Sequence, residues 1–127
     1  MIFLVIVSGS ACNAPESEQF GLPKASEIPK LREQALAGSG VAARRLALWH
    51  MYKPSGEETY ERWTRIGAQN GDAVSQYNLA LSYLIDRIEE PQSEERGLFW
   101  LRKAAAGGSA KAAEELRERG KRGRERP

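Results

Sequence analysis

The sequence predicts an all-α fold, a short α-solenoid built from antiparallel helix hairpins. One observation is a repeat: WTRIGAQNGDA (63–73) recurs 37 residues later as WLRKAAAGGSA (100–110), with tryptophan, arginine, alanine and glycine in matching places. A second is that GVAARRLALWHMY (40–52) matches GDAVSQYNLALSY (71–83) at a spacing of 31 residues. At about 100° per residue, the shared apolar positions fall on one broad helix face. Helix-forming segments that recur in this way stack into rows of helix pairs.

Length and composition are typical of one small soluble domain. The chain has 127 residues, of which 41% are hydrophobic and 28% are charged. The formal net charge of +2 is too small to indicate a polyanionic partner. Residues 117–127 contain six basic and two acidic residues but no aromatic side chain that could stack on bases. We therefore expect no nucleic-acid partner and a basic, disordered tail over 121–127, with a phosphate-binding arm as the alternative.

The first twelve residues, MIFLVIVSGSAC (1–12), carry no charge and run from an apolar stretch into small residues that end at Cys12. This order resembles the end of a bacterial lipoprotein signal, in which the cysteine receives lipid. It predicts lipidation of Cys12 and a location on the periplasmic side of a bacterial cell envelope. The alternative is a buried strand or a disordered apolar end, which would leave the protein in the cytoplasm. Residues 13–29 then form a tether rich in proline, serine and glutamate.

From about residue 30 the apolar pattern is helical. KLREQALAGSG (30–40) is expected to form a leading half-hairpin, because Ala37 and Gly40 take the places that alanine and glycine take before the later turns. Two full hairpins and a terminal helix follow, and the solenoid spans residues 30–120. The expected helices cover about 30–39, 41–53, 56–69, 72–87, 93–106 and 109–120.

Local signals justify the boundaries of these helices. Ser55 and Glu58 have the spacing of a capping box at the start of the third helix. Asp72 is expected to cap the fourth helix, and Ser109 takes the same place before the sixth. The two repeat spacings, 31 and 37, differ by six residues, which predicts an insertion within LIDRIEE (84–90).

Small residues are expected to mark the tight contacts between helices. Gly107 and Gly108 allow a sharp turn with a left-handed cap, and the neighbouring alanines let two helix backbones approach closely. Trp63 and Trp100 lie one to two turns earlier, where a large apolar group can fill the space between neighbouring hairpins.

These segments resemble the Sel-one-like repeat family, a branch of the tetratricopeptide-like α-solenoids. GDAVSQYNLALSY and WLRKAAAGGSA are similar to the two halves of that family's signature, and the resemblance covers roughly residues 30–119. The loops KPSG and IDRIEEPQ depart from the glycine-rich turn that the family usually has. The resemblance implies protein binding, since related repeats serve as adaptors, assembly factors and, in bacteria, exported proteins that include immunity factors against secreted toxins.

The sequence offers little for catalysis. His50 is the only histidine, and a solvated or half-buried histidine is expected there instead of a general base. The only aspartates, Asp72 and Asp86, fall at a helix start and in the predicted insertion. No phosphate loop, metal-ligand spacing or dinucleotide fingerprint is present in the sequence. We expect no enzymatic activity, no cofactor, no metal and no small-molecule substrate.

The functional prediction is a non-enzymatic protein-interaction module that binds a partner such as a secreted toxic effector. The first helices of successive hairpins line the inner curve of a solenoid, where one exposed position per turn contributes to a groove. An alternative for Tyr77 and Leu84 is a place in the core, with the charged positions only solvated. The alternative function is a structural or assembly-supporting envelope lipoprotein without a toxin partner. The candidate partner-binding residues are His50, Lys53, Tyr77, Leu81, Leu84, Lys111, Glu114 and Glu118.

Overall fold

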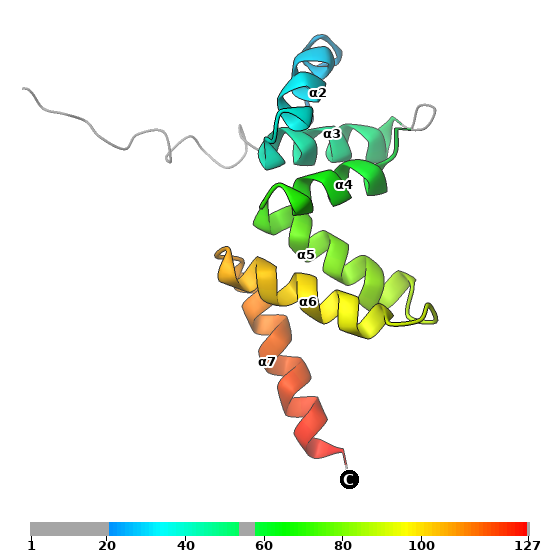
Figure 1. The fold of residues 1–127 in the computed structure, drawn as a ribbon, viewed down its shortest axis with the longest axis vertical. Coiled ribbons are helices and arrows are strands. Elements are labelled where there is room, and N and C mark those ends of the chain that lie inside the picture. The colour runs from blue at the N-terminus through cyan, green and yellow to red at the C-terminus, as the bar shows by residue number, and fades with distance from the viewer. Residues whose placement is uncertain (1–20, 54–57, 127) are drawn as a thin grey trace, which may run out of the picture.

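The structure, a computed structural model, describes residues 21–53 and 58–126 and is all-helical over these residues. Within these residues, six α-helices follow one another in a stack, from α2 at one end to α7 at the other (Figure 1). The all-α prediction is confirmed. The predictions for residues 1–12, including Cys12, for residues 13–20 of the tether and for Ser55 as a cap lie outside the described residues. The predicted start of the third helix at about residue 56 is wrong, because Thr59 caps a helix that begins at Tyr60. The helices are α2 (Ile28–Leu36), α3 (Gly40–Tyr52), α4 (Tyr60–Gln69), α5 (Ala73–Leu81), α6 (Ser93–Ala106) and α7 (Ala110–Glu125).

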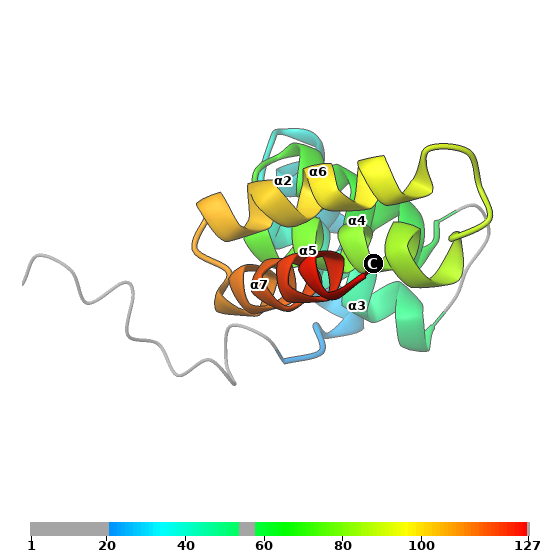
Figure 2. The ribbon, with the colours of Figure 1, turned by 90° about the horizontal axis from the view of Figure 1, so that it is seen from below.

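Each helix packs chiefly against the next one in the chain. Figure 2 shows that α3, α5 and α7 lie on one side of the stack and that α2, α4 and α6 lie on the other. We call α3, α5 and α7 the first helices, and α2, α4 and α6 the second helices. Within the described chain, no helix is long and apolar enough to span a bilayer.

The same turn precedes every first helix. Gly38, Gly71 and Gly108 have φ angles of 111°, 87° and 100°, a left-handed conformation that favours glycine. The residue after each glycine caps the helix with a side-chain oxygen, which accepts from a backbone N–H three positions later. The distances are 3.1 Å for Ser39 to Ala42, 2.8 Å for Asp72 to Ser75 and 3.2 Å for Ser109 to Ala112. The expected caps Asp72 and Ser109 are confirmed.

These caps correct the predicted alignment of the first hairpin. Ser39 corresponds to Asp72, a spacing of 33 residues, so Gly38 and not Gly40 matches Gly71. Gly40 instead lies buried in the first turn of α3, where an added Cβ would be 2.9 Å from the Cβ of Asp72. A glycine is needed there because α3 and the start of α5 come that close. The alignment error is two residues, or about 200° around a helix axis.

The insertion in the second hairpin is therefore four residues, the difference between spacings of 33 and 37, and not six. It lies between the end of α5 and the middle of α6. There α5 ends in a π-helical turn, η3 (Ser82–Asp86), and α6 is 14 residues long where α4 has 10. At the other end, a 3-10 turn, η2 (Ala25–Glu27), leads into α2 two residues earlier than expected.

The core consists of leucines and alanines from both rows of helices. Leu46 and Leu79, at equivalent places in α3 and α5, are fully buried, and so are Ala35, Ala68 and Ala104 on the second helices. These alanines lie near the ends of their helices, as expected for close backbone contacts. Trp63 is 1% exposed and Trp100 is half-buried, which agrees with their expected places between helices.

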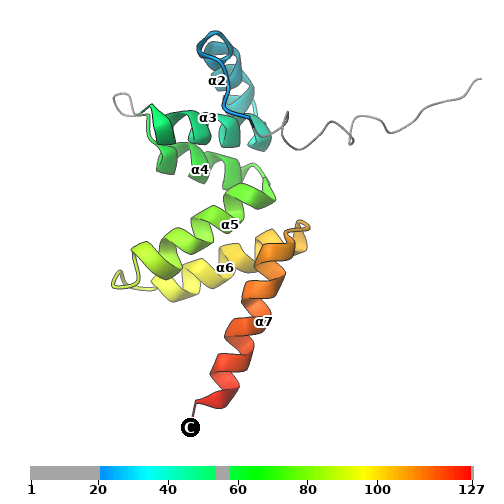
Figure 3. The ribbon, with the colours of Figure 1, turned by 180° about the vertical axis from the view of Figure 1, so that it is seen from behind.

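The terminal helix is longer than predicted. α7 continues to Glu125, so the expectation of a disordered tail over 121–127 is wrong for residues 121–125. Pairs of opposite charge one turn apart support these turns, including Lys121 with Glu118 at 3.1 Å and Arg119 with Glu115 at 2.8 Å. Basic residues in the last turn also suit the negative end of the helix. Figure 3 shows this part of α7 extending away from the stack.

Candidate functional site

A concave surface crosses the first helices. Its central hollow, of about 490 Å³, lies between α3, α4 and α5 and reaches Lys111 at the start of α7. Two smaller hollows join it: one of about 290 Å³ shares Tyr60, Thr64 and Asn78 with it, and one of about 350 Å³ shares Lys111. We call the surface formed by these three hollows the first-helix groove. The central hollow is lined by Arg44, Arg45, Ala47, Leu48, Met51, Tyr60, Thr64, Val74, Ser75, Asn78 and Lys111.

The floor of the central hollow is apolar and accessible. Met51 on α3 and Val74 on α5 are 48% and 43% exposed, and Leu48 beside them is half-buried. Leu48 and Met51 are three residues apart, so they lie on one face of α3. Such exposed apolar groups in a concave surface are typical of sites that bind another molecule.

The rim of the central hollow is basic. The Nε atom of Arg44 lies 3.5 Å from Oδ2 of Asp72, the cap of α5. Burial lowers the pKa of Arg44, and the charge of Asp72 opposes that effect. An arginine retains its charge in proteins even so. The Nη2 atom of Arg45 lies 3.2 Å from Oε1 of Glu27, and Lys111 completes the rim on the side of α7.

Four of the eight predicted partner-binding residues lie in the groove. Tyr77, Lys111 and Glu114 line one of the smaller hollows together, and Leu81 lines the other. Tyr77 is half-buried and packs against the core with one side, so it belongs both to the core and to the groove.

Two further predicted residues are exposed but lie outside the groove. Lys53 places its Nζ atom 4.6 Å from the ring centre of Trp49, beyond the hollows. Glu118 lies farther along α7, where it pairs with Lys121.

His50 and Leu84 are corrections, because both are buried and cannot meet a partner. Only 2% of His50 and 5% of Leu84 is exposed. In the observed alignment His50 corresponds to Tyr83, which is also buried, so the two-residue error moved a core position onto the predicted surface. Leu84 lies in η3 against Gly97 of α6, where an added Cβ would collide with the leucine. The alternative that Leu84 belongs to the core is confirmed.

His50 has a structural partner. Its Nε2 atom lies 3.0 Å from Oε2 of Glu58, and the same oxygen accepts from Nη2 of Arg32 at 2.7 Å. Arg32 belongs to α2, His50 to α3, and Glu58 immediately precedes α4. The cluster therefore ties three successive segments together, which accounts for a buried polar side chain at this place.

The groove residues that the sequence argument missed are Leu48, Met51, Val74 and Asn78. A sequence signal for Val74 did exist. Aligning the repeats on Gly38, Gly71 and Gly108 would have placed Val41, Val74 and Lys111 at equivalent positions. All three are exposed. The contributions of Tyr60 and Thr64 depend on how α4 crosses the first helices, which no local pattern encodes.

The arrangement of an apolar floor and a basic rim suits the binding of another molecule. Among residues 21–53 and 58–126, no group of three or more histidine, cysteine, aspartate or glutamate side chains could hold a metal ion. Of the acidic groups at the groove, Glu61, Glu114 and Glu115 are members of ion pairs. No protein-family model, curated protein or solved structure matches this chain.

Proposed function

We propose that this protein is a non-enzymatic protein-interaction module that binds a segment of a partner protein in the first-helix groove. The observation that carries the proposal is the groove itself, whose three hollows share lining residues and extend over α3, α4, α5 and the start of α7. An apolar floor with a charged rim is the usual anatomy of a protein–protein contact. A small-molecule site would be more enclosed.

The repeated construction supports an α-solenoid of the Sel-one-like type. Three turns with the same left-handed glycine and the same cap start α3, α5 and α7. First and second helices alternate along the chain and occupy opposite sides of the stack (Figure 2). Repeat proteins of this kind use the surface made by equivalent helices to bind extended partners.

The partner that this resemblance favours is a secreted toxic effector, for which the protein would be an immunity factor in a bacterial envelope. The segment MIFLVIVSGSAC supports export and lipidation at Cys12. Mass spectrometry of the mature N-terminus from the native host tests this location. A lipid-modified chain that starts at Cys12 is expected, and an unmodified chain that starts at Met1 would contradict it.

Two equivalent valines provide a matched test of the groove. Val41 and Val74 both lie two residues after a helix cap, and they are 49% and 43% exposed. Only Val74 lines the first-helix groove. Tagged wild-type protein, Val41→Glu and Val74→Glu should be used to capture partners from the native host, with circular dichroism as the check on folding.

We expect wild type and Val41→Glu to recover the same partner and Val74→Glu to lose it, because a carboxylate in the apolar floor opposes burial. Met51→Glu should behave like Val74→Glu. Equal recovery by all four folded proteins would contradict the groove assignment and favour a structural role for the stack.

A further inference from the structure

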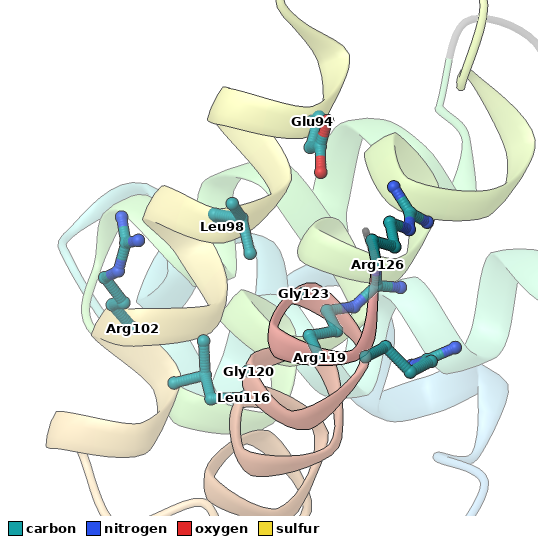
Figure 4. A pocket seen from close by; sticks show the side chains of 9 residues that line it. Glu94, Leu98, Arg102, Leu116, Arg119, Gly120, Gly123 and Arg126 are labelled. Carbon is teal, nitrogen blue, oxygen red and sulfur yellow. The ribbon is translucent and has the colours of Figure 1, made fainter.

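A separate hollow, of about 330 Å³, lies between α6 and α7 and shares no lining residue with the first-helix groove. It follows both helices lengthwise. On α6 it runs from Glu94 through Leu98 to Arg102, positions four residues apart that form one stripe. On α7 it runs from Leu116 to Arg126, the residue that follows the end of the helix (Figure 4). Eight residues of helix span about 12 Å, so the open hollow is about as long as two turns of a helix laid along it.

The hollow gathers positive charge. Four arginines line it, namely Arg102, Arg119, Arg122 and Arg126, against a single glutamate. Arg119 and Arg122 share Glu115, at 2.8 and 3.5 Å. Arg102 and Arg126 make no ion pair with any described residue. The hollow therefore retains unbalanced positive charge within the described chain.

This charge is not a by-product of how the helix pairs pack. The hollow between α4 and α5 is its counterpart one repeat earlier, 37 residues back. In that earlier hollow, Glu61 is equivalent to Leu98, and Ser82 is equivalent to Arg119. Asp86 is equivalent to Gly123. The earlier hollow has two acidic side chains, Glu61 and Asp86, and no basic one, whereas the last hollow has four arginines and one glutamate. The last helix pair thus has its own surface chemistry.

The floor of the hollow favours a peptide over a nucleic acid. Leu98 and Leu116 are half-buried and pack on the core beneath the arginines. No aromatic side chain lines the hollow, so it lacks the groups on which bases stack. Leucines would bind apolar side chains, and guanidinium groups pair well with carboxylates.

The face of α7 that lines the hollow is also open to close approach. Gly120 and Gly123 lie inside the helix, and a Cβ at either one would have no heavy atom within 4 Å. A helix placed between α6 and α7 could approach α7 closely at these two positions.

We propose that the hollow between α6 and α7 binds an acidic amphipathic helix of a partner protein. Its leucine-like side chains pack on Leu98 and Leu116, and its flanking carboxylates pair with Arg102 and the arginines of α7. Glu94 at one end of the hollow favours a basic residue at the matching end of the partner helix, which fixes its direction.

The test is fluorescence anisotropy of the full chain with a labelled peptide of about 15 residues, with leucines at i, i+3, i+4 and i+7 and glutamates on both flanks. A second peptide has glutamine in place of every glutamate. We expect the glutamate peptide to bind and the glutamine peptide to bind about tenfold more weakly or not at all. Equal binding of the two peptides, or no binding of the glutamate peptide, would overturn the proposal.

Matched variants locate the site. Arg102→Glu with Arg126→Glu should weaken binding about tenfold or more. Arg62→Glu with Arg124→Glu makes the same change of net charge at exposed arginines outside the hollow, and it should stay within about twofold of wild type. Equal loss in both double variants would mean non-specific attraction and overturn the proposal.

A third variant tests shape without charge. Gly120→Leu places a large side chain in the hollow and improves helix propensity, so the fold is retained while peptide binding is expected to fall. Val74→Glu should leave peptide binding unchanged, which separates this site from the first-helix groove. A single-stranded oligonucleotide and phosphatidylglycerol vesicles should also be tested as competitors of the labelled peptide. If either one displaces the peptide better than unlabelled peptide does, and this effect depends on Arg102 and Arg126, the hollow binds another class of ligand.

Discussion

Arg32, His50 and Glu58 show how single polar side chains connect helices in this stack. One oxygen of Glu58 lies 2.7 Å from Nη2 of Arg32 and 3.0 Å from Nε2 of His50, and the imidazole of His50 is fully enclosed. A buried polar group without a partner costs about 1–3 kcal/mol, so the carboxylate is what makes a histidine acceptable in the core at this place. His50 therefore fills a core position, as Tyr83 does at the equivalent place in η3.

Replacing His50 with alanine should destabilise the fold. The change leaves a cavity beside α4 and removes the imidazole next to Glu58, and we expect a loss of about 2–3 kcal/mol in the free energy of unfolding. Urea denaturation measures it. Lys53→Ala is the control, since it removes an exposed side chain and one cation–π contact and should cost less than about 1 kcal/mol. A His50→Ala effect no larger than the control would mean that His50 is not a core residue.

The pair of Glu61 and Arg87 predicts a dependence on pH. The hydrogen bond from Arg87 holds the pKa of Glu61 below its ordinary value of 4.5, and the charges of Arg87 and Arg65 act in the same direction. Because the folded pKa is the lower one, this stabilisation is present above pH 4.5 and is lost as the pH falls through the folded value.

Glu61→Gln should therefore be less stable than wild type at neutral pH, by at most about 1 kcal/mol because the pair is partly exposed. The difference should shrink as the pH is lowered toward about 3. Urea denaturation at several pH values measures it, with Glu89→Gln as an exposed control. A difference that is independent of pH would contradict the ion-pair explanation.

At the scale of helices, close crossings depend on glycines with no room for a side chain. Gly67 of α4 lies against Ser75 of α5, and an added Cβ would be 2.9 Å from the Cβ of Ser75. Ser75 cannot move away easily, because it is 1% exposed and its Oγ donates to Asp72 at 2.7 Å. Gly120 of α7 is the opposite case, with open space around it.

Alanine at these two glycines should have opposite effects on stability. Gly67→Ala must push α4 away from α5, and we expect a loss of about 1–3 kcal/mol. Gly120→Ala should gain about 0.5–1 kcal/mol, since alanine restricts the unfolded chain in a helix where nothing opposes it. Thermal unfolding of both variants tests this contrast. A neutral Gly67→Ala would mean that the crossing of α4 and α5 is looser than described.

The helices were predictable because caps, turns and apolar spacing are local features of the sequence. Asp72 and Ser109 could be identified as caps on this basis. The alignment of the first hairpin was missed although the same signals were present: GSG offers two glycines, and only Gly38 is followed by a capping residue, Ser39. The hollow between α6 and α7 was missed for another reason: Arg102 and Arg126 lie 24 residues apart, and only the angle between two helices brings them together.

At the scale of the whole molecule, stability is built up from contacts between successive helices. α7 is the last of these helices, and it is attached mainly by its first two turns. Ala112 is fully buried and Leu116 is half-buried, whereas residues 117–125 are exposed except for Arg119, which is half-exposed. In stacks of this kind, the free energy of unfolding is close to a sum of helix and neighbour terms. The end of α7 should then contribute little to the fold.

Two truncations test this architecture. Removing residues 118–127 leaves Ala112 and Leu116 in place and should change the free energy of unfolding by less than about 1 kcal/mol. Removing residues 109–127 exposes Leu101 and Ala104 of α6, which are both fully buried, and should cost about 2 kcal/mol or more at about 25 cal/mol per Å² of apolar surface. Urea denaturation gives both values. The shorter truncation also removes Arg119, Arg122 and Arg126, so it should abolish binding of the acidic peptide while the fold remains intact. Equal destabilisation by the two truncations would mean that the exposed turns of α7 are part of the folded core.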